Sequence, residues 1–354
     1  MLRVNNLRAA MAKEAIDGFL VTNPYNLRYL ANFTGTAGVA VITPTKAFFV
    51  TDFRYTEQAA EQALGFEIIK HTGPIFEEVA NICRQEAIEV LAFEETVMSF
   101  AEYTQLEDVV EESSLLPISG LIESLREVKD ESEIALIEKA CAIADQGFAY
   151  ILEQIKPGMT EIQVANQLDF YMRSLGATSV SFDTIVASGV RSALPHGVAS
   201  TKVIEKGDLI TLDFGCYYEG YVSDMTRTFA LGDPGEKLKE IHQIVLEAQL
   251  MVNAVAKAGM SGVELDAVAR DYIASHGYGE AFGHSTGHGI GLEIHEGPNV
   301  SFKSPKLFVP GNVITNEPGI YLPGIGGVRI EDDLLITTTG NRILTHSPKE
   351  LIIL

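Results

Sequence analysis

Two aspartates within TLDFGCYYEGYVSDMTRTF, residues 211–229, have the spacing of a paired acid site. Asp213 and Asp224 lie on two runs of apolar, aromatic and β-branched residues around Gly220, which predicts a β-hairpin. A register that pairs Tyr217 with Gly220 makes them face each other, and a two-residue shift keeps both on one face. Two like charges so close are destabilising unless a cation separates them. We therefore expect half of a metal site, the alternative being an exposed hairpin with two solvated acids.

Two glutamates further along the chain occupy positions that repeat those of the aspartates. The string GDLITLDFG, which holds Asp213, recurs as GNVITNEPG with Glu317 in the matching position. Glu331 follows in GGVRIEDD and takes the part of Asp224. Four carboxylates exceed what one divalent ion usually needs, so we expect two ions that share bridging carboxylates.

The glycine-rich stretch GHSTGHGIGLEIHEGP, residues 283–298, supplies imidazoles to the same site. Its glycines exclude a stable helix and indicate a strand pressed close to other backbone. His288, between two glycines, is the expected nitrogen ligand, and His284 and His295 are candidate donors at the open side. A single histidine in such a strand is more often structural. Three of them beside four acids favour a site.

Two more residues are candidates for contact with a substrate. His196, in SALPHG, occupies roughly the place in the first repeat that the histidines occupy in the second. Arg329 lies two residues before Glu331. It is either a counter-charge to the acids or a substrate-binding group, since a guanidinium suits both.

An internal repeat must position these side chains. KPGMT, ending at Thr160, recurs as KAGMS, ending at Ser261. Each copy follows a long helical pattern and opens another with a glutamine or glutamate three residues on, the spacing of a capping box. Each half therefore reads as two helices followed by strands. Packing of the halves about a pseudo-twofold axis would bring Asp213 and Glu317 together.

The first 125 residues contain no comparable cluster. Strand patterns occur at 18–22, 38–43, 47–52, 66–71, 90–93 and 115–118, and helical patterns at 55–64, 75–87 and 100–111. This alternation predicts an α/β domain with a largely covered sheet. The charged segment REVKDESE then leads into a long amphipathic helix. We therefore expect two domains, an α/β domain at 1–125 and a catalytic domain at 126–354.

The composition excludes some classes of binding partner and indicates the cellular compartment. The chain has 26 basic and 48 acidic residues, a formal net charge of −22, which argues against nucleic acid or an anionic membrane as partner. Its three cysteines lie far apart without a CxxC, so no disulfide framework or zinc ribbon is expected. We find no signal peptide and no apolar stretch of spanning length. A soluble, cytoplasmic protein is expected.

The order Asp, Asp, His, Glu, Glu resembles that of the metallopeptidase family with the pita-bread fold, which includes methionine aminopeptidases, Xaa-Pro aminopeptidases (aminopeptidase P) and Xaa-Pro dipeptidases (prolidases). The strings that carry it are LDFGCYYEGYVSDMTRTF, GHSTGHGIGLEIHEGP, ITNEPGIY and GGVRIEDD, and it is dense from Lys129 onward. TNPYNLRYLANFTGTAG and FVTDFRYTEQA resemble the extra domain of the Xaa-Pro members. The resemblance implies an α+β chain: a duplicated, pseudo-twofold pita-bread catalytic domain preceded by a smaller α/β creatinase-like domain.

The resemblance also implies a ligand set for the two metal ions. Asp213 would chelate one metal, His288 and Glu317 would bind the other, and Asp224 and Glu331 would bridge them. Oxygen-rich ligands with one imidazole fit manganese, with cobalt, iron or zinc also possible. The same fold includes metal-free creatine amidinohydrolases and non-catalytic interaction domains. In those the ligand set is altered, whereas here it is intact.

We accordingly expect a homodimeric enzyme that hydrolyses the Xaa-Pro bond of short peptides. Glu317 would take and return the proton, and His295 and His196 would assist at the substrate. The alternative is an aminopeptidase P that acts on longer peptides. A dipeptidase needs a cation for the proline carboxylate, for which His196, Arg329 and Arg54 are candidates. On this pocket-closing argument we favour the dipeptidase.

Overall fold

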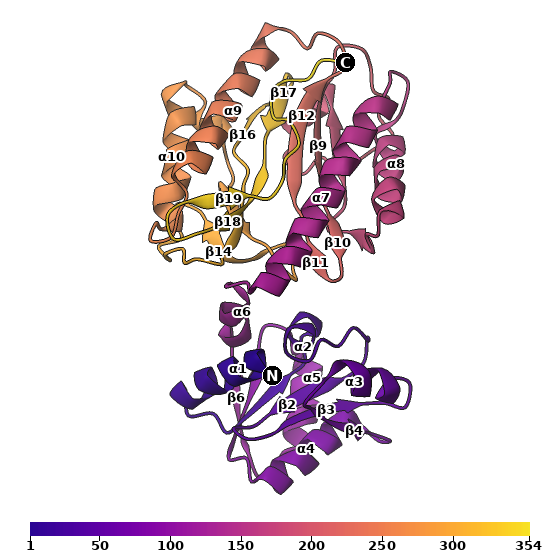
Figure 1. Ribbon diagram of the computed structural model, residues 1–354, viewed down its shortest axis with the longest axis vertical. Helices are drawn as coiled ribbons and strands as arrows, with labels where there is room; N and C mark the ends of the chain where they lie inside the picture. Colours follow the sequence, from indigo (N-terminus) through magenta and orange to yellow (C-terminus); the bar gives the residue numbers. More distant parts are fainter. The chain divides into compact units, whose positions relative to one another are not determined.

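The computed structural model describes all 354 residues, and the chain divides into two compact units, Met1–Arg126 and Glu127–Leu354 (Figure 1). The first unit ends one residue beyond the expected 125. None of the helices has both the length and the apolar character needed to cross a membrane.

The first unit is a six-stranded sheet with helices on its faces, in the strand order β4-β3-β2-β1-β5-β6. Its helices are α1 (Leu2–Lys13), α2 (Pro24–Ala31), α3 (Thr56–Gln62), α4 (Ile75–Glu86), α5 (Phe100–Val109) and α6 (Leu121–Arg126). Its strands are β1 (Gly18–Val21), β2 (Val39–Ile42), β3 (Ala47–Thr51), β4 (Glu67–Lys70), β5 (Val90–Glu94) and β6 (Ser114–Ile118). The central strands β1, β2 and β3 are buried along their whole length, which explains their unbroken apolar runs.

All six strand patterns and three helical patterns of this unit are found within two residues of their predicted limits, and three helices, α1, α2 and α6, were not predicted. Helix α2 begins at Pro24 and is capped by Asn23, whose side chain accepts from the Tyr25 amide. That is an ordinary start signal. Helix α1 lacks a side-chain cap and depends on the burial of Val4 and Leu7.

The second unit is built from two similar halves. The first half contains α7 (Glu131–Gln154), α8 (Glu161–Ser174), β7 (Ser179–Val180), β8 (Ile185–Ser188), the 3₁₀ turn η1 (Gly189–Ala193), β9 (Leu209–Phe214), β10 (Cys216–Tyr218), β11 (Tyr221–Val222) and β12 (Met225–Ala230). The second half contains α9 (Glu236–Val255), α10 (Gly262–Ser275), η2 (Gly279–Ala281), β13 (Gly287–Gly289), β14 (Glu296–Val300), β15 (Val313–Asn316), β16 (Gly319–Leu322), β17 (Gly326–Arg329), β18 (Asp332–Ile336) and β19 (Asn341–Ile343). In Figure 1 the strands lie between the α7–α8 pair and the α9–α10 pair.

The predicted capping boxes are both present and open the second helix of each half. Thr160 caps α8 together with Gln163, and Ser261 caps α10 together with Glu264. Each half has its own buried apolar cluster, one around Phe148 and the other around Leu265. The repeat seen in the sequence is therefore a structural repeat.

The halves meet where β12 runs beside the segment that follows β17. The Thr228 hydroxyl donates to the Arg329 carbonyl at 2.8 Å, and the Glu331 amide donates to the Thr226 carbonyl at 3.1 Å. Glu331 was expected on a strand but lies between β17 and β18. Backbone pairing to the other half, rather than a strand of its own, fixes its position.

The hairpin has the alternative register, two residues from the one that pairs Tyr217 with Gly220. Tyr218 pairs with Tyr221, and Asp213 pairs with Thr226. The two-residue loop at Glu219 and Gly220 has positive φ at both positions, the conformation that matches the twist of a tight hairpin. Asp213 and Asp224 are therefore diagonal neighbours on one face.

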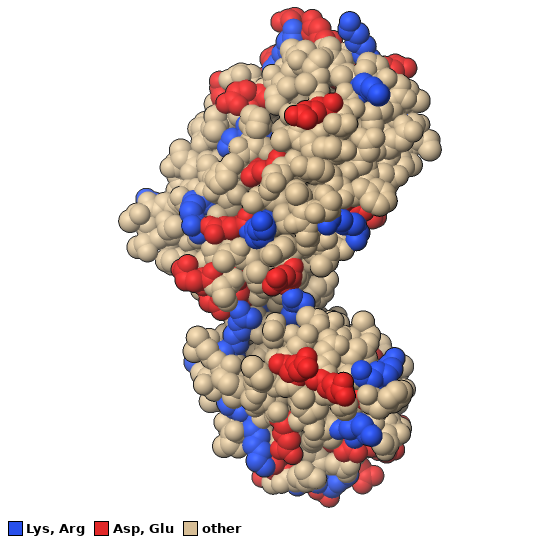
Figure 2. All heavy atoms as spheres, turned by 45° about the vertical axis from the view of Figure 1, so that its right-hand side comes forward, with Lys and Arg blue, Asp and Glu red and all other residues tan.

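The charges of the surface are mixed. On the face shown in Figure 2, lysine and arginine side chains are scattered among aspartates and glutamates and form no extended basic patch.

Candidate active site

A cavity of about 470 Å³ in the second unit is lined by nine of the ten residues that the sequence singled out, all but Arg54. They are Asp213, Asp224, His288, Glu317, Glu331, His196, His284, His295 and Arg329. The pocket also has apolar wall residues that the sequence did not indicate, among them Phe182, Ile185 and Val198. Acids and histidines from both halves thus meet in one hollow, as the pseudo-twofold arrangement requires.

Asp213, on the hairpin, has one carboxylate oxygen that accepts a hydrogen bond and one that does not. Its Oδ2 accepts from Arg329 Nη2 at 2.5 Å, while Oδ1 is buried and has no hydrogen-bond partner. A buried carboxylate oxygen without a donor is costly. This orphaned oxygen at the pocket wall fits a cation ligand.

Glu331 is held by a hydroxyl from the neighbouring strand. Its Oε2 accepts from Thr226 Oγ1 at 2.6 Å, and the same hydroxyl accepts from Arg329 Nε at 3.1 Å. Thr226 is a neutral residue and was not among the predicted site residues. It contacts Glu331 because of the hairpin register, which could not be chosen from the sequence.

His288 is oriented with its Nε2 toward the acids. Its Nδ1 lies 3.0 Å from the Gly289 carbonyl, so Nδ1–H donates there and Nε2 of the neutral ring carries the lone pair. Nε2 lies 3.4 Å from Glu317 Oε1 and 3.6 Å from Asp224 Oδ2. Ligand atoms of Asp224, His288 and Glu331 all lie within 4.8 Å of one another.

The glycines on either side of His288 allow the close backbone contact that the sequence predicted. A Cβ at Gly287 would lie 2.1 Å from the Thr315 carbonyl oxygen, and one at Gly289 would lie 2.2 Å from the Gly297 carbonyl oxygen. Both distances are too short for any side chain. The pair therefore lets β13 sit between β14 and β15 with the imidazole facing the pocket.

Burial and crowding make the acids hard to ionise without a cation. Burial raises the pKa of Asp224 and of Glu331 well above their usual range, and the neighbouring carboxylates raise both further. Burial also raises the pKa of Glu317 to about 8, although Arg329 opposes the shift. The pKa of His288 is lowered to about 4, first by burial and then by the nearby His295. Divalent ions would replace the protons that these groups otherwise retain.

Arg329 and His284 are engaged with other side chains of the pocket wall. Arg329 Nη1 donates to the Tyr321 hydroxyl at 2.7 Å, and this hydroxyl donates to His284 Nε2 at 2.8 Å. His284 Nδ1–H donates to the Ser285 carbonyl at 2.8 Å, and burial, followed by the charge of Arg329, lowers the pKa of His284 to about 4. These contacts favour the counter-charge role for Arg329 and leave His284 no free donor, contrary to its expected role at the open side.

His196 and His295 lie at the exposed side of the pocket. The His295 ring lies 4.3 Å from that of His288, centroid to centroid, with 58° between the planes. Burial lowers the pKa of His295, and the nearby His196 adds to the effect. These two rings are the imidazoles that a bound molecule would meet.

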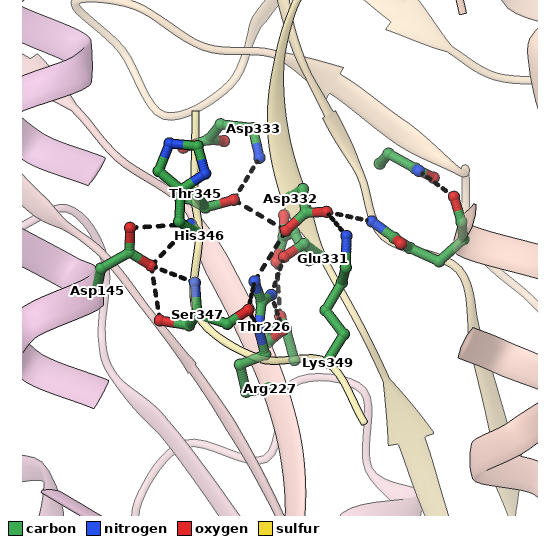
Figure 3. Close-up of polar contacts among 12 residues, drawn as sticks. Asp145, Thr226, Arg227, Glu331, Asp332, Asp333, Thr345, His346, Ser347 and Lys349 are labelled. Atoms are coloured by element: carbon green, nitrogen blue, oxygen red, sulfur yellow. Dashed lines mark hydrogen bonds and ion pairs between the residues drawn. The ribbon is translucent and has the colours of Figure 1, made fainter. Parts of the chain in front are cut away.

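Behind the pocket a second layer of polar contacts fixes the acids. Asp333 Oδ2 accepts from the Asp224 amide at 3.0 Å. Asp332 accepts from Arg227 Nη2 at 2.8 Å and from Lys349 Nζ at 2.6 Å, as Figure 3 shows. Although burial alone would raise it, these two cations hold the pKa of Asp332 at about 2. Since Arg227 also donates to the Glu331 carbonyl, this layer supports the chain at Glu331. In the sequence, only the two adjacent aspartates of GGVRIEDD indicated this layer of contacts.

The chain matches two family models: metallopeptidase family M24 over residues 135–338 and the creatinase/prolidase N-terminal domain over residues 3–128. It belongs to metallopeptidase family M24, with a creatinase-type N-terminal domain before a pita-bread catalytic domain. The predicted fold class is confirmed. Membership in this family implies divalent metal ions, and its substrates are peptides.

Three relatives illustrate the match. The Xaa-Pro dipeptidase of Pyrococcus horikoshii is 41% identical over 352 residues, covering 99% of this chain and 98% of that protein. The structure of an Xaa-Pro dipeptidase from Bacillus anthracis is 56% identical with a TM-score of 0.99, covering 100% of this chain and 99% of that one. An X-Pro aminopeptidase structure from Thermotoga maritima is 41% identical with a TM-score of 0.92, covering 98% and 100%.

Proposed function

We propose that the protein is an Xaa-Pro dipeptidase that uses two divalent metal ions held by Asp213, Asp224, His288, Glu317 and Glu331. The observation that supports this most is the convergence of one unprotonated imidazole nitrogen, three buried carboxylates and the partly buried Glu317 on a single pocket, with the Asp213 Oδ1 atom lacking any partner. Manganese suits this oxygen-rich set, and cobalt, iron and zinc are the competing ions.

The ions, when bound, supply Lewis acidity that activates a water molecule and polarises the scissile carbonyl. Glu317 is the proton carrier, because a carboxylate beside the activated water can take its proton and return it to the leaving group. His295, at the exposed side, is suited to donate to the carbonyl oxygen of the substrate. Arg329 holds Asp213 in place rather than binding substrate.

The apolar wall of the pocket is suited to bind the ring of proline. Phe182, Ile185 and Val198 present hydrocarbon surface beside the polar groups, which suits a pyrrolidine ring. The scissile bond is a tertiary amide without an N–H, so no donor on the leaving side needs a partner. A pocket with one apolar wall and donors opposite fits such a bond.

The free carboxylate of an Xaa-Pro dipeptide needs a cation or donor in the pocket. Of the three candidates, Arg329 is bound to Asp213, and Arg54 is bidentate to its neighbour Asp52 at 2.9 and 2.7 Å. His196 is the one whose side chain faces the pocket at its exposed side. We assign the carboxylate contact to His196 and retain the dipeptidase over the aminopeptidase P.

A substrate panel tests this assignment. The kcat/KM values of the manganese-loaded protein are measured on Ala-Pro, Ala-Pro-amide and Ala-Pro-Ala, with Ala-Ala as the control for proline. A dipeptidase cleaves Ala-Pro at least about 10-fold better than the amide or the tripeptide, because only Ala-Pro places a carboxylate at His196. Equal rates on all three proline peptides identify an aminopeptidase P instead.

We also propose that the enzyme is a homodimer and, from its composition, that it is cytoplasmic. Sedimentation equilibrium of the purified protein would give twice the mass of one chain, and cell fractionation would recover it in the soluble fraction. A monomer, or recovery with membranes, would contradict these two proposals.

A further inference from the structure

A buried glutamate outside the pocket holds the segment that carries His196. Glu161, the first residue of α8, is completely buried. Its Oε1 accepts from the Ser188 amide at 2.9 Å and from the Ser188 hydroxyl at 2.8 Å. Its Oε2 accepts from the Ser200 amide at 3.0 Å and the Ser200 hydroxyl at 2.6 Å. One carboxylate thus joins the two ends of the loop 189–199.

Arg191 completes this arrangement from within the loop. Its Nη1 forms an ion pair with Glu161, and its Nη2 donates to the Val198 carbonyl at 3.0 Å. Val198 and His196 are both pocket residues, and the Val198 amide donates to the His196 carbonyl at 2.9 Å. The guanidinium therefore links the buried carboxylate directly to the backbone beside His196.

Neither Glu161 nor Arg191 lines the pocket. The buried Glu161 carboxylate accepts four hydrogen bonds from serines and forms an ion pair, so its hydrogen-bonding capacity is satisfied. These contacts also limit the movement of the residues that it joins. Two hydrogen bonds to one loop end would suffice for a simple cap. The contacts to both ends, together with the arginine in the middle, hold the whole loop in one conformation.

The second half of the unit contains a counterpart. Asp266, near the start of α10, is buried and forms an ion pair with Arg270. It accepts from the Thr286 amide at 3.1 Å, and Arg270 Nη2 donates to the His284 carbonyl at 2.8 Å. The aspartate is not at the repeat position of Glu161. Both halves nevertheless use a buried acid and an arginine to fix a histidine-bearing loop at the pocket.

We propose that the Glu161–Arg191 pair is a positioning device for His196, and so sets how well the enzyme holds the carboxylate of its substrate. The proposal rests on the proposed function, because it assigns to this pair a role in substrate affinity rather than in metal binding or stability. Loss of the pair should release the loop and raise KM, while the metal ligands, which lie on other segments, stay in place.

Arg191→Met is the variant of choice because it removes the charge and both contacts while Glu161 keeps its four hydrogen bonds from serine. We expect KM for Ala-Pro to rise about 10-fold with kcat changed less than about 2-fold, and manganese affinity to equal that of the wild type. Arg191→Lys should recover part of the loss. Asp169→Asn, which removes a surface ion pair with Arg173 on the same helix, is the matched control and should change nothing.

A double-mutant cycle with His196→Ala decides whether the pair acts through this histidine. In the His196→Ala background, Arg191→Met should lower kcat/KM by less than about 2-fold, because the residue that it positions is already gone. An equal loss in both backgrounds, or a loss of manganese affinity in Arg191→Met, would overturn the proposal. A wild type that does not cleave Ala-Pro would instead contradict the proposed function, so the two failures are distinct.

Discussion

Asp224 is a proposed metal ligand and, in the metal-free protein, a destabilising acid. Its carboxylate is buried beside Glu331 and Asp213, which together with burial raise its pKa well above the usual range. The protein without metal must therefore keep protons on this cluster or tolerate repulsion within it. Function and stability have opposite requirements at this position.

Asp224→Ala should abolish metal-dependent activity and reduce manganese affinity by at least about 100-fold, since a ligand is lost. It should also raise the stability of the metal-free protein by up to about 1 kcal/mol, because like charges are relieved. Calorimetric metal titration and thermal melting measure the two effects. Asp183→Ala, which removes an exposed acid from the same pocket, is the control. Wild-type turnover in Asp224→Ala would refute the ligand assignment.

The stability of the metal-free protein should depend on pH in a direction set by these acids. Glu317 has a pKa raised from 4.5 to about 8, so the stability that its protonation contributes is lost as the pH rises towards 8. His288, lowered from 6.5 to about 4, loses its contribution only as the pH falls below 6.5. Between pH 6.5 and 8 the metal-free protein should therefore become less stable.

Metal binding should show the reverse dependence, because the ions displace protons from the acids. Manganese affinity should rise from pH 6.5 to 8, and binding at pH 7 should release at least one proton. Calorimetry in buffers of different ionisation enthalpy measures the release. Glu317→Gln should release fewer protons than the wild type. Binding without proton release would show that the carboxylates are already ionised.

Residue types and spacing were sufficient to find the nine pocket residues, because acids and imidazoles on strands are conspicuous. They were not sufficient to separate the roles of Arg329 and His284. Both depend on the Tyr321 hydroxyl, which joins them across the pocket wall. A tyrosine on a strand is ordinary in sequence, and only the packing of β16 against β17 gives it this position.

At the scale of the element, β13 is the strand most constrained by its neighbours. It pairs with β14 on one side and β15 on the other, and the close approach requires glycine at positions 287 and 289. His288 is therefore placed by residues that have no side chain. The glycine-rich pattern was visible in the sequence, although the partners of the strand were not.

Gly289→Ala should push β14 away and displace His288, although no ligand is changed. We expect the melting temperature to fall, with a loss of about 1–3 kcal/mol, and manganese affinity to fall with it. Gly283→Ala is the matched control in the same segment, because a Cβ there would meet nothing within 4 Å. Unchanged metal affinity in Gly289→Ala would show that the imidazole position does not depend on this contact.

For the hairpin, the sequence predicted the shared face of the two aspartates but not the register of the strands. Alternation placed Asp213 and Asp224 on one face in either register. The two-residue turn at Glu219 and Gly220 decided which register formed, because both positions take positive φ. Glutamate is not a usual residue at this turn position, so the register could not be predicted from residue types. The consequence is that Thr226, not Asp224, pairs with Asp213.

At the scale of the whole molecule, the repeat explains why acids far apart in sequence meet in one pocket. Each half contributes two helices, strands and two acids, and backbone pairing between Thr226 and Glu331 joins the halves beside the pocket. The recurrence of KPGMT as KAGMS and of GDLITLDFG as GNVITNEPG predicted this duplication. The support of the chain by Asp332, Arg227 and Lys349 was not predictable, because it joins residues from three separate segments (Figure 3).

The central claim is that metal held in this pocket drives the hydrolysis of an Xaa-Pro bond. The most direct test strips the protein of metal, titrates it with manganese, and records ions bound per chain and the rate of Ala-Pro cleavage in parallel. The account predicts no cleavage by the stripped protein, two ions bound at saturation, and activity that rises with occupancy. Full cleavage of Ala-Pro by the metal-free protein would contradict it.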